Sequence, residues 1–185
     1  LHHRAQRLSV MSMHATMPLN FSVNSKQALE TFRAALTGES FSISVPVSSL
    51  NKLGIARGRL VGGNLSIIYS LIGTTDAYDF KDSILFIEDL SEQLYHIDRM
   101  LFALKKAGVF DEIKALVIGG MTDLKDTNPS FGMTYEESIL EKVKENNLPV
   151  CFNFPSGHIE DNRAMIIGAM VELEVNEQGA KLCYI

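Results

Sequence analysis

The stretches SILFIED (residues 83–89) and VCFNFPSGH (residues 150–158) are two apolar runs that each end near a side chain capable of acid–base chemistry. Those side chains are Glu88 and His158. A buried run turns polar where its strand leaves the sheet, and α/β proteins place their chemistry at that edge. The two stretches therefore predict an α/β fold with a functional site at the ends of its strands.

Other signals extend this pattern along the chain. The sequence predicts a helix over 25–36 stopped by Gly38, a strand in ARGRLVGGN that turns at Gly62 and Gly63, and a helix capped by Asn64. The next predicted elements are a helix from near Ser91 to Gly108 and a strand in IKALVIGG. The last are a helix from a Thr134–Glu137 capping box through Asn146, a strand in PVCFNF and a closing hairpin in MVELEV and AKLCYI.

Strands joined by single helices are normally parallel with right-handed crossovers, so their carboxyl ends share one edge of the sheet. That rule brings Glu88, Gly119, Gly120 and His158 together. A carboxylate that accepts the Nδ1 proton of a histidine leaves Nε2 free to take a proton from a nucleophile. Two members of a catalytic triad are therefore predicted.

The third member has no candidate from the residues alone. The sequence has no G-x-S-x-G elbow, and Ser156 is better explained as a turn residue before Gly157. Each member of the pair also has a simpler interpretation. Glu88 could complement a helix dipole, and His158 could be an ordinary surface-loop residue.

The composition narrows the classes of function. The 185 residues are 46% hydrophobic and 21% charged with a net charge of −5, and the sequence contains neither a membrane-length apolar run nor a cluster of Lys and Arg. These features are typical of a soluble protein that binds neither membranes nor nucleic acid, so we expect a small molecule or peptide as its partner.

Only two cysteines are present, Cys151 and Cys183, and both lie in apolar runs without zinc-ligand spacing. We interpret them as buried free thiols in a reducing, cytoplasmic compartment.

Several further residues have two interpretations. GGN at 62–64 could hold an anion at a helix N-terminus, but it lacks the other residues of a nucleotide site, and a tight turn beside a substrate cleft fits better. His14 is a possible cleft residue. The remaining candidates are assigned to helix surfaces or ion pairs: His2, His3 and His96 to helix surfaces, and Asp98 with Arg99 to a solvated or intramolecular ion pair.

Four motifs together resemble one family. GRLVGGNLS, ILFIEDLSEQLYHIDRML, ALVIGG and FPSGH, in this order and spacing, are similar to the LD-carboxypeptidases, the muramoyltetrapeptide carboxypeptidase group that includes microcin C immunity peptidases. The resemblance covers essentially the whole chain. It implies a C-terminal swivelling β/β/α-type domain at 54–185, a crossing segment at 37–53, and a remnant of a flavodoxin-like N-terminal domain at 1–36.

The resemblance also implies an activity. Family members hydrolyse the amide before a terminal D-amino acid of murein peptides during peptidoglycan recycling, with a Ser-His-Glu triad and no metal or cofactor. By motif, Glu88 is the triad carboxylate and His158 the general base, and Gly63, Asn64, Gly119 and Gly120 are candidates for the substrate cleft. The serine is expected just upstream of Leu1, so the chain alone is expected to be inactive.

Two alternatives stay open: a non-catalytic ligand-binding module that keeps the cleft, and a microcin-type immunity peptidase. A serine on a strand-turn-helix shortly before Leu1 separates the enzyme from the binder. If residues 1–36 are a remnant, their apolar face should be exposed. We therefore expect a homodimer, or association with the missing N-terminal part.

Overall fold

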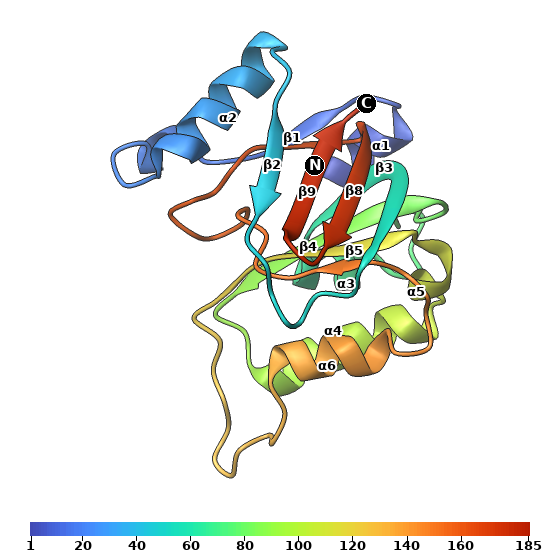
Figure 1. Ribbon diagram of the computed structural model, residues 1–185. Helices are drawn as coiled ribbons and strands as arrows, with labels where there is room; N and C mark the ends of the chain where they lie inside the picture. The colour runs from blue at the N-terminus through green and yellow to red at the C-terminus, as the bar shows by residue number, and fades with distance from the viewer.

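The computed structural model describes residues 1–185 and shows a curved sheet with most of its helices gathered on one face (Figure 1). The strands are β1 Ser12–His14, β2 Ser42–Val45, β3 Gly54–Asn64, β4 Ser83–Leu90, β5 Ala115–Thr122, β6 Val150–Cys151, β7 Met165–Ile167, β8 Met170–Asn176 and β9 Gly179–Tyr184. The helices are α1 His2–Arg7, the 3-10 turn η1 Pro18–Asn20, α2 Lys26–Thr37, α3 Leu65–Leu71, α4 Leu94–Lys106, α5 Val109–Glu112 and α6 Tyr135–Lys142.

The main sheet has seven strands in the order β2-β9-β8-β3-β4-β5-β6. Strands β3 to β6 are parallel neighbours, whereas β8, β9 and β2 add to the other side of β3 in antiparallel fashion. A separate pair, β1 and β7, forms a small second sheet. The α/β class predicted from the alternation of strands and helices is confirmed. The carboxyl ends of β4, β5 and β6 share one edge, as the crossover rule requires.

Two apolar cores lie on opposite faces of the sheet. Successive side chains of a strand point to opposite faces, so Leu85 and Ile87 of β4 join the core under α3, α4 and α6, while Ile84 and Phe86 join the other core. Each fully buried Leu or Ile contributes about 1.5–3 kcal/mol relative to exposure. By the same alternation, Glu88 follows Phe86 onto the face that lies away from these helices.

Local signals set several helix ends as predicted. The side chain of Asn64 accepts a hydrogen bond from the Ile67 amide and caps α3, and Thr134 with Glu137 forms the full capping box of α6. Gly38 ends α2 in a left-handed conformation. Helices α4 and α6 lie side by side in Figure 1 and contact each other.

Two predicted boundaries near β3 and β4 were wrong. Strand β3 does not turn at Gly62 and Gly63 but continues to Asn64, because it pairs with β4 over its whole second half. Helix α4 begins at Leu94 and not at Ser91, because Ser91 has a left-handed φ of 56° that a helix cannot include.

Two predicted elements near the C-terminal half are shorter than expected. Helix α6 ends at Lys142 and not at Asn146, because Val143 leaves helical geometry with φ −104° and ψ 12°. The Lys52 ammonium donates to the carbonyls of Val143 and Asn146 just beyond this end. Strand β6 covers only Val150–Cys151, since the chain bends at Asn153, whose φ is 58°.

The segment 37–53 is more than a crossing, because it contains β2, which pairs with β9 at the edge of the main sheet. The proposed division of the chain into 1–36, 37–53 and 54–185 stays a prediction.

None of the helices is both long enough and apolar enough to span a bilayer.

Gly62 lies where β3 approaches β4 closely enough to exclude a side chain, and its substitution tests this packing. Its φ is 124°, and a Cβ added there would lie 1.9 Å from the Phe86 carbonyl oxygen. We expect Gly62→Ala to lower the free energy of unfolding by at least about 3 kcal/mol, because strand pairing and backbone conformation must both change. Urea unfolding measures this loss. Gly132→Ala is the control, since its φ is 81° but no atom lies within 4 Å, and its expected cost is about 1–2 kcal/mol. Equal losses of unfolding free energy in Gly62→Ala and Gly132→Ala would contradict the close approach of β3 to β4 at Gly62.

Candidate functional site

Glu88 and His158 meet at the carboxyl edge of the parallel strands. The Nδ1 atom of His158 lies 2.7 Å from Oε2 of Glu88. Glu88 has no exposed side-chain area, whereas the His158 side chain is 49% exposed. The structure therefore brings the two predicted residues together, with the carboxylate buried and one side of the imidazole open to solvent.

Backbone contacts across the end of β5 bring His158 to this position. Gly120 and Gly157 form a parallel bridge, and the Gly120 amide donates to the Ser156 carbonyl at 2.8 Å. The Thr122 hydroxyl donates to the His158 carbonyl at 3.2 Å. Gly157 has a φ of 115°, and a Cβ there would lie 3.0 Å from Oε2 of Glu88. Glycine suits this position because other residues rarely adopt that φ and because a Cβ would crowd the carboxylate.

The electrostatics of Glu88 follow from its burial. Burial raises the pKa of Glu88 above its usual value, and the hydrogen bond from His158 offsets only part of that rise. Its other oxygen, Oε1, is buried without a hydrogen-bond partner. An ionised carboxylate can only accept, so Nδ1 of His158 then carries the proton and Nε2 is free to act as a base.

Asp89 points to the opposite face and ties β4 to α3. Its carboxylate accepts hydrogen bonds from Asn64 Nδ2 at 2.8 Å, the Ser66 amide at 2.9 Å and the Leu90 amide at 2.9 Å. Burial raises the pKa of Asp89, and these bonds oppose the rise. Asn64 is the strand partner of Glu88, so this network holds the backbone beside the buried carboxylate.

Two more histidines lie on the same side of the sheet. His14 packs edge-on against Phe86, with ring centroids 5.2 Å apart. Burial lowers the pKa of His14 to about 4, helped by charges on His2 and His158. The assignment of His2 to a helix surface was wrong, because its Nδ1 bonds to the Ser12 hydroxyl at 2.7 Å and its ring faces His14. At neutral pH His14 is therefore an uncharged neighbour of the Glu88–His158 pair.

A cleft of about 430 Å³ opens beside His158. It is lined by His14, Ala15, Met17, Asn20, Val23, Asn24, Gly157, His158, Ile159, Glu160 and Asn162. This lining includes the predicted cleft residue His14. It does not include Gly63, Asn64, Gly119 or Gly120, which lie in or at the ends of β3 and β5. Their role at a substrate cleft stays a prediction.

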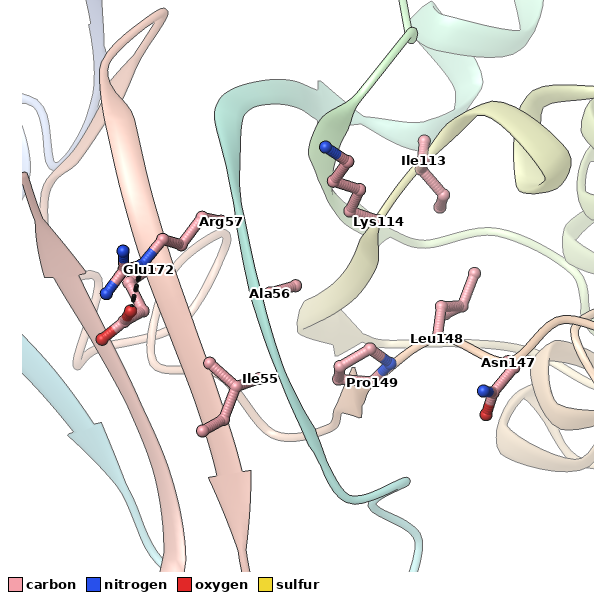
Figure 2. Close-up of a pocket in the computed structure, with 9 residues that line it drawn as sticks. All are labelled: Ile55, Ala56, Arg57, Ile113, Lys114, Asn147, Leu148, Pro149 and Glu172. Atoms are coloured by element: carbon pink, nitrogen blue, oxygen red, sulfur yellow. Dashed lines mark hydrogen bonds and ion pairs between the residues drawn. The ribbon is translucent and has the colours of Figure 1, made fainter.

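A second hollow, of about 830 Å³, lies at the opposite end of the parallel strands (Figure 2). Its charged side chains are already paired, since Arg57 bonds to Glu172 and Lys114 lies 3.1 Å from Asp82. It is lined by Ile55, Ala56, Arg57, Ile113, Lys114, Asn147, Leu148, Pro149 and Glu172. None of these residues is a histidine, serine or cysteine, so the cleft at His158 is the better candidate for catalysis.

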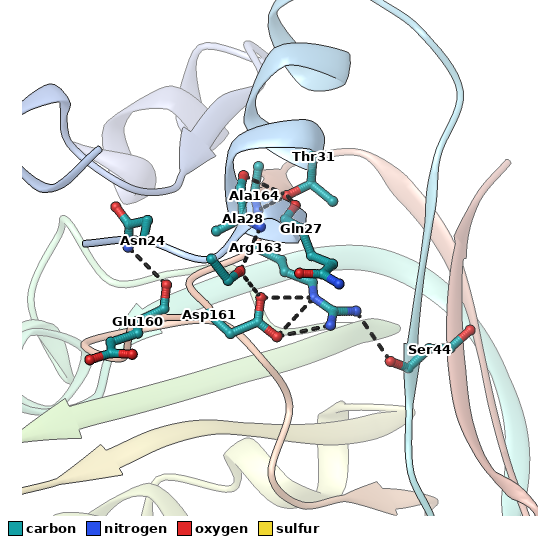
Figure 3. A network of polar contacts seen from close by, with 10 residues as sticks. Asn24, Gln27, Ala28, Thr31, Ser44, Glu160, Asp161, Arg163 and Ala164 are labelled. Atoms are coloured by element: carbon teal, nitrogen blue, oxygen red, sulfur yellow. Dashed lines mark hydrogen bonds and ion pairs between the residues drawn. The ribbon is translucent and has the colours of Figure 1, made fainter. Parts of the chain in front are cut away.

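A polar network that was not predicted from the sequence anchors the loop after His158 (Figure 3). Asp161 accepts hydrogen bonds from the Ser25 hydroxyl at 2.5 Å and from Arg163 Nη2 at 2.8 Å, and Arg163 Nη1 donates to the Ser44 carbonyl at 3.4 Å. Burial raises the pKa of Asp161, but the bonds from Arg163 and Ser25 outweigh it and hold the pKa below its usual value. The polar run IEDNR directly after His158 was the available signal.

Other candidates have structural roles. Asp98 pairs with Lys142 at 2.6 Å and not with Arg99, whose guanidinium lies over the Tyr95 ring. Cys151 is buried and Cys183 half-buried, both as free thiols. No group of three or more His, Cys, Asp or Glu side chains is arranged to hold a metal ion.

The raised pKa of Glu88 predicts a pH-dependent difference between the wild-type chain and Glu88→Gln. The unfolded chain ionises Glu88 near the ordinary value of 4.5, before the folded chain does, so this carboxyl makes the wild type less stable as the pH rises from 4.5. We expect the unfolding free energy of Glu88→Gln, relative to the wild type, to increase over this range and then level off. Urea unfolding at a series of pH values measures it.

The exposed Glu177→Gln controls for the loss of one negative charge. A Glu88→Gln difference that stays flat or shrinks with rising pH would contradict the assignment of a buried, destabilised carboxylate.

Comparison with known proteins identifies the family of this chain. Residues 57–173, which include both Glu88 and His158, match the LD-carboxypeptidase C-terminal domain. A Synechocystis protein named as a carboxypeptidase is 30% identical over 169 residues, covering 89% of this chain and 54% of that protein. The crystal structure of muramoyltetrapeptide carboxypeptidase from Oxalobacter formigenes superposes with a TM-score of 0.87 at 25% identity, covering 99% of this chain and 65% of the other.

The microcin C7 self-immunity protein MccF, in complex with aspartyl sulfamoyl adenosine, has the same fold, with a TM-score of 0.83 at 16% identity, covering 100% of this chain and 64% of the other. The chain thus spans between 54% and 65% of the length of these three proteins. The matched domain contains both members of the buried carboxylate–imidazole pair, and the chain belongs to the LD-carboxypeptidase family.

Proposed function

We propose that this chain carries the Glu–His part of a Ser-His-Glu triad, in an enzyme that removes a C-terminal D-amino acid from murein peptides. The observation that carries the proposal is the 2.7 Å hydrogen bond between Glu88 and the Nδ1 atom of His158. It lies at the edge of a parallel sheet where α/β enzymes bind substrates, and next to a cleft. Membership of a carboxypeptidase family supports the reaction class.

The arrangement suits acyl transfer. Nε2 of His158 takes the proton of a serine hydroxyl as the oxygen attacks the scissile carbonyl, and then delivers that proton to the leaving amine of the D-amino acid. Glu88 holds the ring orientation and stabilises the imidazolium that forms between these two steps. Because Glu88 is buried, water screens its charge from His158 very little.

The nucleophile in this proposal comes from a segment that precedes residue 1 in a longer form of the protein. Within this chain no hydroxyl or thiol is hydrogen-bonded to Nε2 of His158. Ser156 is fully buried with its hydroxyl unpartnered, and burial raises the pKa of Cys151 to about 12. The coverage of only 54% of the Synechocystis relative is consistent with a further segment.

Exposed apolar side chains near the start of the chain support the same proposal. Strand β1 has one unpaired edge, since it pairs only with β7. Seven large apolar side chains in residues 1–23 are more than half exposed: Leu1, Leu8, Val10, Met11, Met17, Leu19 and Val23. A surface of this kind is typical of an interface. Met17 and Val23 line the cleft, and we propose that the preceding segment covers the apolar side chains outside it, which include Leu1, Leu8 and Met11.

The activity test uses a form of the protein extended upstream, with a murein tetrapeptide ending in D-alanine as substrate. We expect release of D-alanine by the extended form, and a loss on the order of 10⁴ or more in kcat for His158→Ala and Glu88→Ala, because triad members act as a unit. Chromatography of released D-alanine measures the rate. His96→Ala is the matched control, since His96 bonds to Glu92 away from the cleft.

Full activity in His158→Ala would refute the assigned base. D-Alanine release by the 185-residue chain alone would refute the upstream nucleophile, and no release by the extended form would refute the carboxypeptidase proposal.

The exposed apolar surface predicts a difference in association. We expect the 185-residue chain to form dimers or larger species in light scattering, because its apolar surface lacks a cover, and the extended form to expose less of that surface to a hydrophobic dye. Replacement of Leu8 and Met11 by serine should weaken association of the short chain. A clean monomer for the unmodified short chain would contradict this interpretation.

A further inference from the structure

The side-chain amide of Asn162 lies in the wall of the cleft beside His158. Its Oδ1 accepts a hydrogen bond from the Gly157 amide at 2.9 Å. A backbone N–H can only donate, so the atom that faces Gly157 must be the oxygen of the carboxamide. This contact fixes the orientation of the planar amide, and its NH₂ group must point away from Gly157.

The NH₂ group of Asn162 has no partner within the chain. No intramolecular hydrogen bond uses Nδ2, and this atom is not among the buried polar atoms that lack a partner, so solvent or a ligand can reach it. Asn24, in the same cleft wall, differs in this respect. Its Nδ2 donates to the Glu160 carbonyl at 2.9 Å, and its Oδ1 accepts from the Thr16 hydroxyl. Asn24 therefore has one of its two N–H groups in use, whereas both are free in Asn162. The side chain of Asn20, also in the wall, makes no hydrogen bond within the chain, so of the amides in this cleft with a wholly free NH₂ group only that of Asn162 has its orientation fixed.

The neighbours of Asn162 are held firmly on both sides. Asp161 accepts a hydrogen bond from Ser25 at the start of α2 (Figure 3). Arg163 donates to the Asp161 carboxylate and to the Ser44 carbonyl. The Arg163 amide also donates to the Pro155 carbonyl at 2.8 Å. A donor on such a braced loop loses little conformational freedom on binding, which favours affinity.

We propose that Asn162 is a substrate-binding residue whose NH₂ group donates a hydrogen bond to a backbone carbonyl of the peptide substrate. This inference rests on the proposed carboxypeptidase function. The cleft wall contains no Lys or Arg, so its donors suit a neutral carbonyl better than a carboxylate, which prefers charged partners. Through Gly157, the same amide also supports the backbone that carries His158.

The test is Asn162→Asp in the upstream-extended protein. Aspartate keeps an oxygen for the Gly157 amide but replaces the NH₂ donor with a second acceptor. We expect KM for the tetrapeptide ending in D-alanine to rise about tenfold or more, with kcat changed by less than about twofold, because the lost bond contributes to binding in both the ground and transition states. Asn153→Asp, at an exposed position outside the cleft, controls for the same change in charge.

An unchanged KM in Asn162→Asp would overturn the inference. It would leave the proposed function intact, which fails only if the wild-type extended protein releases no D-alanine. A second measurement does not depend on the folding of this variant. In the His158→Ala protein, the side-chain NH₂ signals of Asn162 should shift in NMR spectra as the tetrapeptide is added. Signals that stay fixed while backbone signals of the cleft move would also overturn it.

Discussion

The hydrogen bond between Glu88 and His158 depends on the way the chain crosses from β4 to the loop after β6. The two residues are 70 positions apart, and strand β5 lies between the strands that lead to them. Two glycines make the crossing short enough. Gly120 forms a β-bridge with Gly157 near the end of β5. Gly157 contacts the Glu88 side chain closely because it has no side chain of its own. A side chain at Gly157 would crowd the Glu88 side chain and strain the backbone at its φ of 115°, so the site depends on backbone packing as well as on acid–base chemistry.

The fold supports a carboxylate that is costly to bury. Glu88 has one oxygen bonded to His158 and one without a partner, and burial raises its pKa. A single hydrogen bond does not balance the loss of hydration of an ionised carboxylate. The parallel strands around Glu88 are packed on both faces by apolar cores. Asp89, the next residue of β4, accepts a hydrogen bond from the Ser66 amide and so ties this strand to the start of α3. The stability of these layers keeps Glu88 in a position that its own contacts do not favour, as is common at functional sites.

The parts of the structure that could be predicted from sequence follow short-range rules or strong topological ones. Helix caps at Asn64 and Thr134 depend on neighbouring residues alone, and the meeting of Glu88 with His158 follows from parallel strands sharing an edge. The errors have long-range causes. The carbonyls just beyond the end of α6 bond to Lys52, which lies more than 90 positions earlier in the sequence, and β2 is a strand because it pairs with β9. The proposed role of Asn162 depends on its contact with Gly157, which follows no sequence periodicity, so no pattern could predict it.

The loop from Gly157 to Arg163 links the proposed chemistry to the rest of the molecule. At one end it is bonded to β5 through Gly120 and Thr122, and at the other to Ser25 at the N-cap of α2 through Asp161. Helix α2 begins within the segment 1–36 and ends one residue beyond it, and the sequence predicts an origin of this segment in a first domain. A bond from that segment to the loop therefore fixes His158 relative to both parts of the chain. A general base must stay within hydrogen-bond distance of its nucleophile. If the nucleophile comes from the first domain, a loop that is bonded to both parts of the chain keeps His158 at hydrogen-bond distance from that nucleophile. The cleft beside His158 can then stay open to a peptide.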